Sequence, residues 1–104
     1  MLRAANVAAL LRMESIPLLP GARALAAHGV ESTLGPANRR ALEGFGGTDA
    51  VLLADPQTSG GLLVGIPAAR SDACLRALLD AGVAAALIGD VAPVDDGPSR
   101  IRLE

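Results

Sequence analysis

The stretch from Leu52 to Ile66, LLADPQTSGGLLVGI, constrains the fold most, because two adjacent glycines lead directly into an apolar run. Glycine loses more backbone freedom on folding than any other residue. Gly60-Gly61 is therefore costly unless the backbone takes a positive φ or another group approaches it closely. Asp55-Pro56 ends the apolar run that comes before. The sequence predicts a polar turn that feeds a buried strand from Gly61 to Ile66.

The polar turn is also a candidate ligand site. Its three central side chains supply hydrogen-bond donors and acceptors at the start of the predicted strand. Backbone N–H groups in such a turn can form a concavity that binds anions. Two interpretations stay open here: a turn that faces a phosphate, and a purely structural turn. The candidate substrate- or phosphate-proximal residues are Asp55, Gln57, Thr58, Ser59, Gly60 and Gly61.

Length and composition favour one domain, residues 1–104, with a small-residue core. Apolar residues make up 51% of the chain and charged residues 19%, which excludes an intrinsically disordered protein. Phe45 is the one aromatic residue, so the core must be built from Leu, Val, Ile and Ala. Small side chains favour close packing of helices on a sheet, and we expect an α/β or α+β domain.

Charge and cysteine content narrow the function classes. The chain has nine Arg, no Lys and a net charge of −2, with no basic stripe, which disfavours nucleic-acid binding. No apolar run approaches the ~18 residues that a bilayer span needs, and we expect no membrane association. Cys74 is the single cysteine, which rules out an internal disulfide and suits a reducing compartment. We therefore expect a cytoplasmic protein.

In the first half of the chain, periodicity predicts one strand and several short helices. Residues 7–15 alternate as a strand does, although the Ala-rich residues 4–11 are also compatible with a helix, which would leave only 13–16 as strand. Helices are predicted for 22–28, closed by Gly29, and for 36–43. Residues 49–54 form a helix capped by Thr48 or else a strand, since a short apolar run does not decide its own period.

In the second half, the longest helix is predicted from Pro67 to about Ala81, ended by Gly82. Cys74 falls on its apolar stripe, and we expect a packed thiol rather than a nucleophile. A second buried strand is predicted for 83–91. The alternation in residues 101–103 predicts a final edge strand that forms a hairpin with the preceding strand.

Isolated polar residues elsewhere have structural interpretations. His28 lies in a last helical turn, where an imidazolium complements the helix dipole. Arg39 and Arg40 could grip a phosphate, but two arginines on a short surface helix are typical of a solvated face. Asp95-Asp96 lacks a third ligand nearby, and we expect a solvated turn.

The chain lacks the usual signatures of a complete active site. It contains no GxGxxG, Walker A, HExxH or paired-cysteine motif. Ser59 lies in TSGG rather than in the GxSxG turn of hydrolases. With one His and no Lys, the choice of general acids, bases and nucleophiles is small. We expect no catalytic residue here and no metal or cofactor bound by this chain alone.

Several segments together resemble selenophosphate synthetase, also called selenide, water dikinase. They are DPQTSGGLLVGIP at 55–67, AAALIGDV at 84–91 and SIPLLPGARALAAHGV at 15–30. The resemblance covers nearly the whole chain, and its DPQTSGG string is specific to that context. The order Asn38-Arg39-Arg40 departs from the Arg-Asn order of many members, which leaves the role of these positions open.

The resemblance implies that the chain is the carboxy-terminal domain of such an enzyme, with the ATP-binding amino-terminal domain absent. It implies helices on a mixed β-sheet, similar to the carboxy-terminal domain of aminoimidazole ribonucleotide synthetase-like enzymes. The family reaction converts ATP, selenide and water to selenophosphate, AMP and phosphate, with Mg²⁺. The reactive Cys or selenocysteine, the Lys and the metal-binding aspartates of the family lie upstream, so Cys74 is not the catalytic cysteine.

Two functions follow as hypotheses. In the first, the chain supports the ATP and metal site of a missing amino-terminal half, its partner, in an enzyme expected to be a homodimer. In the second, it is a free-standing, non-catalytic module that binds a partner or itself. We expect the chain alone to be inactive. If a partner domain has been removed, as in the first hypothesis, we expect an exposed apolar face that favours self-association.

Overall fold

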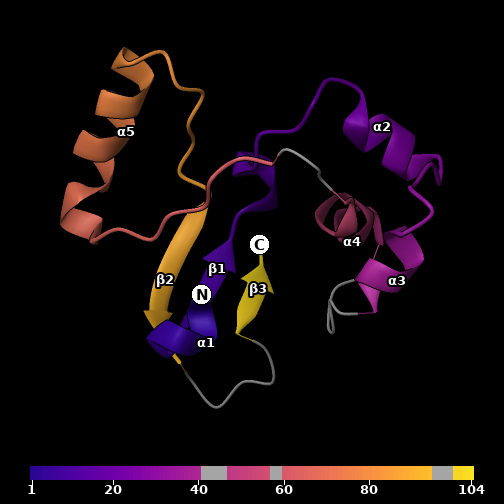
Figure 1. The fold of residues 1–104 in the computed structure, drawn as a ribbon, viewed down its shortest axis with the longest axis horizontal. Coiled ribbons are helices and arrows are strands. Elements are labelled where there is room, and N and C mark those ends of the chain that lie inside the picture. The colour runs from indigo at the N-terminus through magenta and orange to yellow at the C-terminus, as the bar shows by residue number, and fades with distance from the viewer. Residues whose placement is uncertain (41–46, 57–59, 95–99) are drawn as a thin grey trace. The chain divides into compact units, whose positions relative to one another are not determined.

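The computed structural model describes residues 1–40, 47–56, 60–94 and 100–104, and it combines helices with a three-stranded mixed sheet (Figure 1). This is an α+β fold, as predicted. The chain divides into two compact units. Unit 1 comprises Met1–Pro17 and Leu62–Glu104, and unit 2 comprises Leu18–Gly61.

The sheet of unit 1 is centred on the amino-terminal strand β1 (Val7–Leu11). On one side β1 pairs antiparallel with β2 (Gly89–Pro93), and on the other it pairs parallel with β3 (Ile101–Leu103). The ladder extends past β1, because the amide of Arg12 donates to the Ile88 carbonyl at 2.9 Å. The predicted final strand is confirmed, but its predicted hairpin with the preceding strand is wrong.

Short helical turns flank β1 on both sides. α1 (Leu2–Ala5) ends at Asn6, whose left-handed φ of 52° turns the chain into the strand. Met13–Ser15 forms the 3₁₀ turn η1 rather than the end of a longer strand. The strand predicted for 7–15 is thus confirmed only over 7–11. The alternative helix over 4–11 is wrong, because tertiary pairing overrides the helix propensity of alanine.

The strand predicted for 61–66 does not form in the structure. Residues 61–66 have no regular secondary structure and are exposed, although their composition favours a strand. The strand predicted for 83–91 begins only at Gly89, and residues 83–88 are irregular. A strand forms only where its backbone finds a partner strand. Among the described residues, 61–66 has no backbone partner, and in 83–88 the ladder is reached only at Ile88, whose carbonyl accepts from the Arg12 amide.

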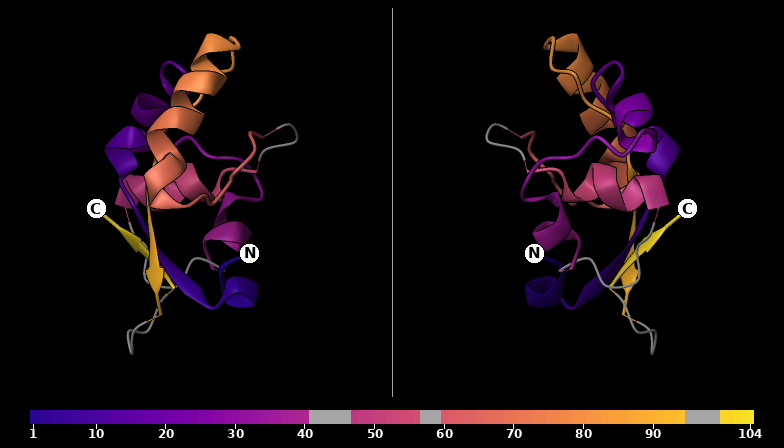
Figure 2. Two further views of the ribbon diagram at one scale, coloured as in Figure 1. Left: turned by 90° about the vertical axis from the view of Figure 1, so that its left-hand side faces the viewer. Right: turned by 90° about the vertical axis from the view of Figure 1, so that its right-hand side faces the viewer.

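The predicted long helix is confirmed as η2 (Ala68–Arg70) followed by α5 (Ser71–Asp80). Gly82 takes φ 76° after its end, as expected of a glycine that terminates a helix. α5 extends past the end of β2 and covers neither face of the sheet (Figure 2). Cys74 on α5 is therefore half-buried rather than fully packed.

The described residues of unit 2 form three short helices, α2 (Ala22–Ala27), α3 (Gly35–Arg39) and α4 (Gly47–Ala54), and both α2 and α3 contact α4. Gly29 follows α2 with φ 76°, as predicted. α4 is a helix, which settles the choice between helix and strand there. Where burial is described in this unit, the buried apolar residues are alanines, which allows the helices to pack closely: Ala26, Ala50 and Ala54.

Candidate functional site

The candidate turn begins at the carboxyl end of α4. Ala50 and Ala54 lie one helical turn apart and are both buried, so this face of α4 is fixed in the core of unit 2. Asp55 and Pro56 follow at once and are exposed. Pro56 disfavours helical geometry in the residue before it. The helix therefore ends where the polar turn starts, and the start of the turn is attached to a packed element.

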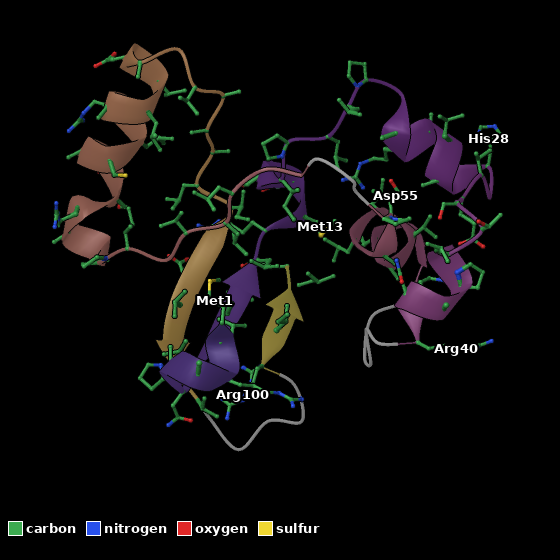
Figure 3. All side chains as sticks on the ribbon, in the orientation of Figure 1. Met1, Met13, His28, Arg40, Asp55 and Arg100 are labelled. Atoms are coloured by element: carbon green, nitrogen blue, oxygen red, sulfur yellow. The ribbon has the colours of Figure 1, made fainter. Side chains whose placement is uncertain are left out.

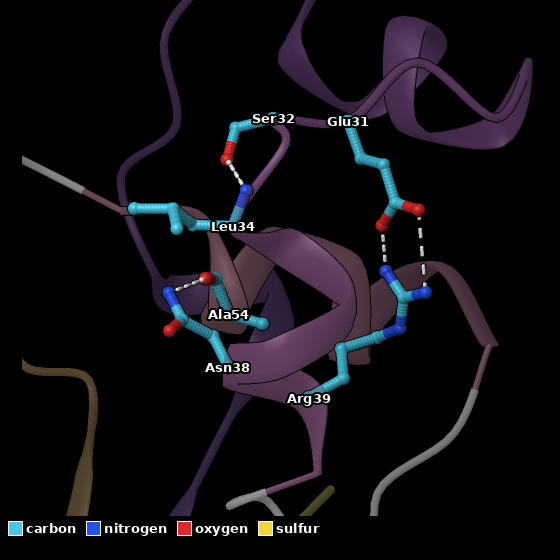
Figure 4. Close-up of polar contacts among 6 residues, drawn as sticks. All are labelled: Glu31, Ser32, Leu34, Asn38, Arg39 and Ala54. Atoms are coloured by element: carbon cyan, nitrogen blue, oxygen red, sulfur yellow. Dashed lines mark hydrogen bonds and ion pairs between the residues drawn. The ribbon is translucent and has the colours of Figure 1, made fainter.

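A side chain of α3 holds this helix end in place. The Asn38 amide Nδ2 donates to the Ala54 carbonyl at 2.9 Å, in a partly buried position (Figure 4). The last carbonyls of a helix have no partner within the helix and need one from elsewhere. Asn38 supplies that partner from sixteen positions earlier in the chain. Ala54, the residue before Asp55, is thus held in place both by its position in α4 and by the hydrogen bond from Asn38.

The loop before α3 is fixed by two further contacts, both shown in Figure 4. Arg39 and Glu31 form a two-point ion pair, in which Nη2 donates to Oε1 at 3.3 Å and Nη1 pairs with Oε2. The Ser32 hydroxyl accepts from the amide of Leu34 at 3.1 Å. Because Glu31 already engages the Arg39 guanidinium, the structure favours a structural role for Arg39 over phosphate binding.

Arg40 and His28 lie outside this cluster. Arg40 is exposed and extends from the end of α3 away from Asp55 (Figure 3). The His28 ring lies at the end of α2, where Nδ1 contacts the Ala24 carbonyl at 2.8 Å. This contact agrees with the predicted structural role of His28 at a helix end.

The two glycines of the motif do not lead into the buried strand that the sequence predicted. Gly60 and Gly61 are both exposed. The φ of Gly61 lies outside the left-handed region, and a Cβ placed there would meet no atom within 4 Å. A positive φ therefore does not explain Gly61, and no described protein atom approaches it closely. The predicted site residues Gln57, Thr58 and Ser59 lie outside the described residues.

Charge contacts elsewhere are structural. Arg23 on α2 pairs with Asp49 in the first turn of α4 at 3.3 Å, where a carboxylate also complements the helix dipole. In unit 1, Arg12 Nη1 donates to Asp90 Oδ2 at 2.5 Å. This hydrogen bond, aided by the charge of Asp90, raises the pKa of Arg12. The ion pair joins the residue that follows β1 to β2.

The described part of the chain offers neither a metal-ligand cluster nor a membrane-spanning helix. Over 1–40, 47–56, 60–94 and 100–104, no three His, Cys, Asp or Glu side chains gather as metal ligands. Within the same ranges, no helix has the length and apolar character needed to cross a membrane.

Sequence reasoning left the role of Asn38 open and did not predict its contact with α4. Its partner is a backbone carbonyl, which carries no residue-specific signal, and the two positions lie on different helices. The Glu31–Arg39 pair was missed for a related reason: its spacing of eight is not one of the helical spacings that predict a pair.

The chain is similar to curated selenide, water dikinases from several bacteria. It is 42% identical to the enzyme of Myxococcus xanthus over 98 residues, which cover 88% of this chain and 28% of the relative. It is 40% identical to that of Burkholderia ambifaria over 95% of this chain and 29% of the relative. It is 44% identical to that of Desulfitobacterium hafniense over 62% of this chain and 21% of the relative. No protein-family model matches the sequence.

The share of each relative that is covered matters as much as the identity. The chain spans less than a third of the length of these three relatives, while most of its own length takes part in each match. It therefore corresponds to one region of a longer enzyme.

Proposed function

The chain belongs to the selenide, water dikinase family, and we propose that it acts as the carboxy-terminal domain of such an enzyme. The observation that carries this proposal is the 42% identity over 88% of the chain. The proposed reaction of the complete enzyme converts ATP, selenide and water to selenophosphate, AMP and phosphate. A fold like that of the carboxy-terminal domain of aminoimidazole ribonucleotide synthetase is part of the same proposal.

Within that enzyme, we assign the turn at 55–61 to the side of the domain that faces the substrates. Its first residue, Asp55, is exposed and directly follows a helix end that Asn38 fixes. A polar turn on a rigid support suits a group that must be held at a set distance from bound phosphates. The proposed substrate-proximal residues remain Asp55, Gln57, Thr58, Ser59, Gly60 and Gly61.

The catalytic and metal-binding groups are assigned to the remainder of the enzyme. The described residues do not fit a magnesium site, because they gather no set of three ligating side chains. We derive no step through the metal from this chain. ATP and Mg²⁺ belong to the complete enzyme in this proposal, which also includes a cytoplasmic location and homodimer formation.

The proposal is tested by adding the chain to a dikinase that lacks the corresponding region. The probe is the Myxococcus xanthus relative without its matched residues, called here the truncated relative. Calorimetry with ATP and Mg²⁺ and an assay of AMP formation are run on each protein alone and on the mixture. We expect the mixture to bind ATP and form AMP in the presence of selenide, and this chain alone to do neither.

A variant set localises the effect to the turn. Asp55→Asn with Gln57→Ala should lower AMP formation at least tenfold in the mixture, while Arg40→Ala, on the neighbouring helix, should leave it unchanged. If the mixture neither binds ATP nor forms AMP at concentrations where both proteins are folded, the proposal is contradicted and the free-standing module is favoured. ATP binding by this chain alone would instead make the turn a nucleotide site in its own right.

A further inference from the structure

Asn38 uses its side chain to join two helices of unit 2. It lies half-buried near the end of α3, and its Nδ2 donates to the carbonyl of Ala54, the last residue of α4 (Figure 4). Asparagine is a poor helix former, because its amide competes for nearby backbone partners. Here the amide bonds to another helix instead. The contact therefore completes the end of α4 and adds nothing to the backbone hydrogen bonds of α3.

The neighbours of Asn38 hold its donor in place. α3 has only five residues, too few for a helix that is stable on its own. The Ser32 hydroxyl accepts from the Leu34 amide just before α3 begins, and the ion pair between Arg39 and Glu31 fixes its last residue. The short helix is thus held at both ends, and the Asn38 amide reaches α4 from a prearranged position.

α4 is also held at both ends, by side chains of the other two helices. In its first turn Asp49 pairs with Arg23 of α2 at 3.3 Å, and at its last residue the carbonyl accepts from Asn38 of α3. Between these contacts, Ala50 is 2% exposed and Ala54 5%, which leaves this face little room to move. Only the Asn38 contact lies directly before the polar turn, so it alone fixes where the turn starts.

Resting on the proposed function, we propose that Asn38 is a positioning residue for the dikinase reaction, which holds Asp55 at its working distance from the bound phosphates. Asn38 acts through the Ala54 carbonyl and needs no contact with substrate. Without this donor the last carbonyl of α4 loses its partner, the helix end frays, and Asp55 shifts with it. A misplacement of about 1 Å caused by a substitution far from the chemistry costs roughly a hundredfold in rate.

Steady-state kinetics of a chimera test this role. In the chimera, this chain replaces the matched residues of the Myxococcus xanthus relative, and AMP formation gives kcat and the KM for ATP. Asn38→Ala and Asn38→Asp should each lower kcat roughly tenfold or more, because neither side chain offers a donor to the Ala54 carbonyl. KM should change by less than about threefold, since the nucleotide-binding groups are assigned to the rest of the enzyme. A kcat equal to that of the unsubstituted chimera overturns the proposal.

Two control variants separate positioning from a general loss of structure. Ser71→Ala removes a bond of the same kind, from the Ser71 hydroxyl to the Ala68 carbonyl at 2.8 Å, at the start of α5. Arg23→Ala releases the opposite end of α4 from α2. Both should change kcat by less than about threefold in a chimera that circular dichroism shows to be folded. A loss from either control as large as that from Asn38→Ala contradicts a specific role for Asn38.

A double-mutant cycle shows whether Asn38 acts through Asp55. Asn38→Ala is introduced into the chimera and into its Asp55→Ala variant. In the second background it should cost less than about threefold in kcat, because the group that Asn38 positions is already gone. Equal fold-losses in the two backgrounds mean that Asn38 acts independently of Asp55, and they overturn the proposal.

The same kinetics distinguish this proposal from the proposed function. An active chimera whose Asn38 variants keep full kcat refutes the positioning role alone. A folded but inactive unsubstituted chimera, beside an active Myxococcus xanthus relative, refutes the proposed function and with it any role of Asn38 in the reaction. If the chimera does not fold, the same variants are measured in the mixture with the truncated relative, under the same criteria.

Discussion

Replacing Gly89 by alanine should destabilise the sheet of unit 1, because the glycine lies against backbone atoms of β1. A Cβ at this position would lie 2.1 Å from the Leu10 carbonyl oxygen and 3.0 Å from Leu11 Cα. These are backbone atoms and cannot rotate away as the end of a flexible side chain can. The β1–β2 ladder must therefore open where Gly89 pairs with Leu11.

The expected loss is about 2 kcal/mol of unfolding free energy. Forcing extra volume into a packed region costs roughly 1–3 kcal/mol. Weakening the bond from the Arg12 amide to the Ile88 carbonyl adds about 0.5–1.5 kcal/mol. Stiffening of the unfolded chain by alanine offsets roughly 0.4–1 kcal/mol of this cost. The loss should lower the midpoint of urea unfolding by roughly 1–2 M.

The assay is urea unfolding followed by backbone circular dichroism, since the chain has no Trp or Tyr for fluorescence. Two other glycines serve as controls. Gly61→Ala meets no atom and needs no positive φ, so it should be neutral or raise stability by about 0.4–1 kcal/mol. Gly82→Ala has open space but φ 76°, so it isolates backbone strain, about 1–2 kcal/mol.

The unfolding free energies of the three glycine variants, taken together, test whether the close contact at Gly89 causes the loss. Unchanged stability in Gly89→Ala would mean that β2 does not lie against Leu10 as the structure has it. A loss in Gly61→Ala as large as that in Gly89→Ala would mean that the double glycine is constrained in this chain after all.

Two substitutions in unit 2 give further predictions. Asn38→Ala should cost about 1 kcal/mol, because the Ala54 carbonyl loses its side-chain donor, whereas Arg40→Ala should cost under about 0.5 kcal/mol. Equal urea midpoints for these two variants would contradict the anchoring role of Asn38. Ala50→Leu should cost about 1–3 kcal/mol, since Ala50 is only 2% exposed, while Ala73→Leu on exposed α5 should change little. A midpoint for Ala50→Leu equal to that of wild type would show that the α4 core has spare room.

The helices could be predicted from the sequence because their signals are local. Gly29 and Gly82 mark the ends of two predicted helices, and both take the left-handed conformation that only glycine adopts easily. The final strand was predicted for the same reason, from the alternation of 101–103. Each of these signals lies within a few residues of the feature that it specifies.

Strand partners could not be predicted, because pairing is a property of two segments. The final strand pairs with β1, far away in the sequence, rather than with its neighbour β2. Local alternation carries no information about that choice. In the candidate site, the Asp55–Gly61 motif was visible in the sequence, but the Asn38 bond that fixes its start joins a side chain to a backbone carbonyl and left no pattern.

The same distinction explains why 61–66 was assigned to a strand that the structure does not contain. Composition specifies what a segment is suited to, and the structure shows whether the chain itself provides the partner. In unit 2 the short helices pack through buried alanines, and the Ala54 carbonyl at a helix end accepts a hydrogen bond from Asn38. Unit 1 leaves Leu62 and Val64 exposed. A local strand signal therefore predicts a strand only where a second segment pairs with it, as β2 and β3 pair with β1.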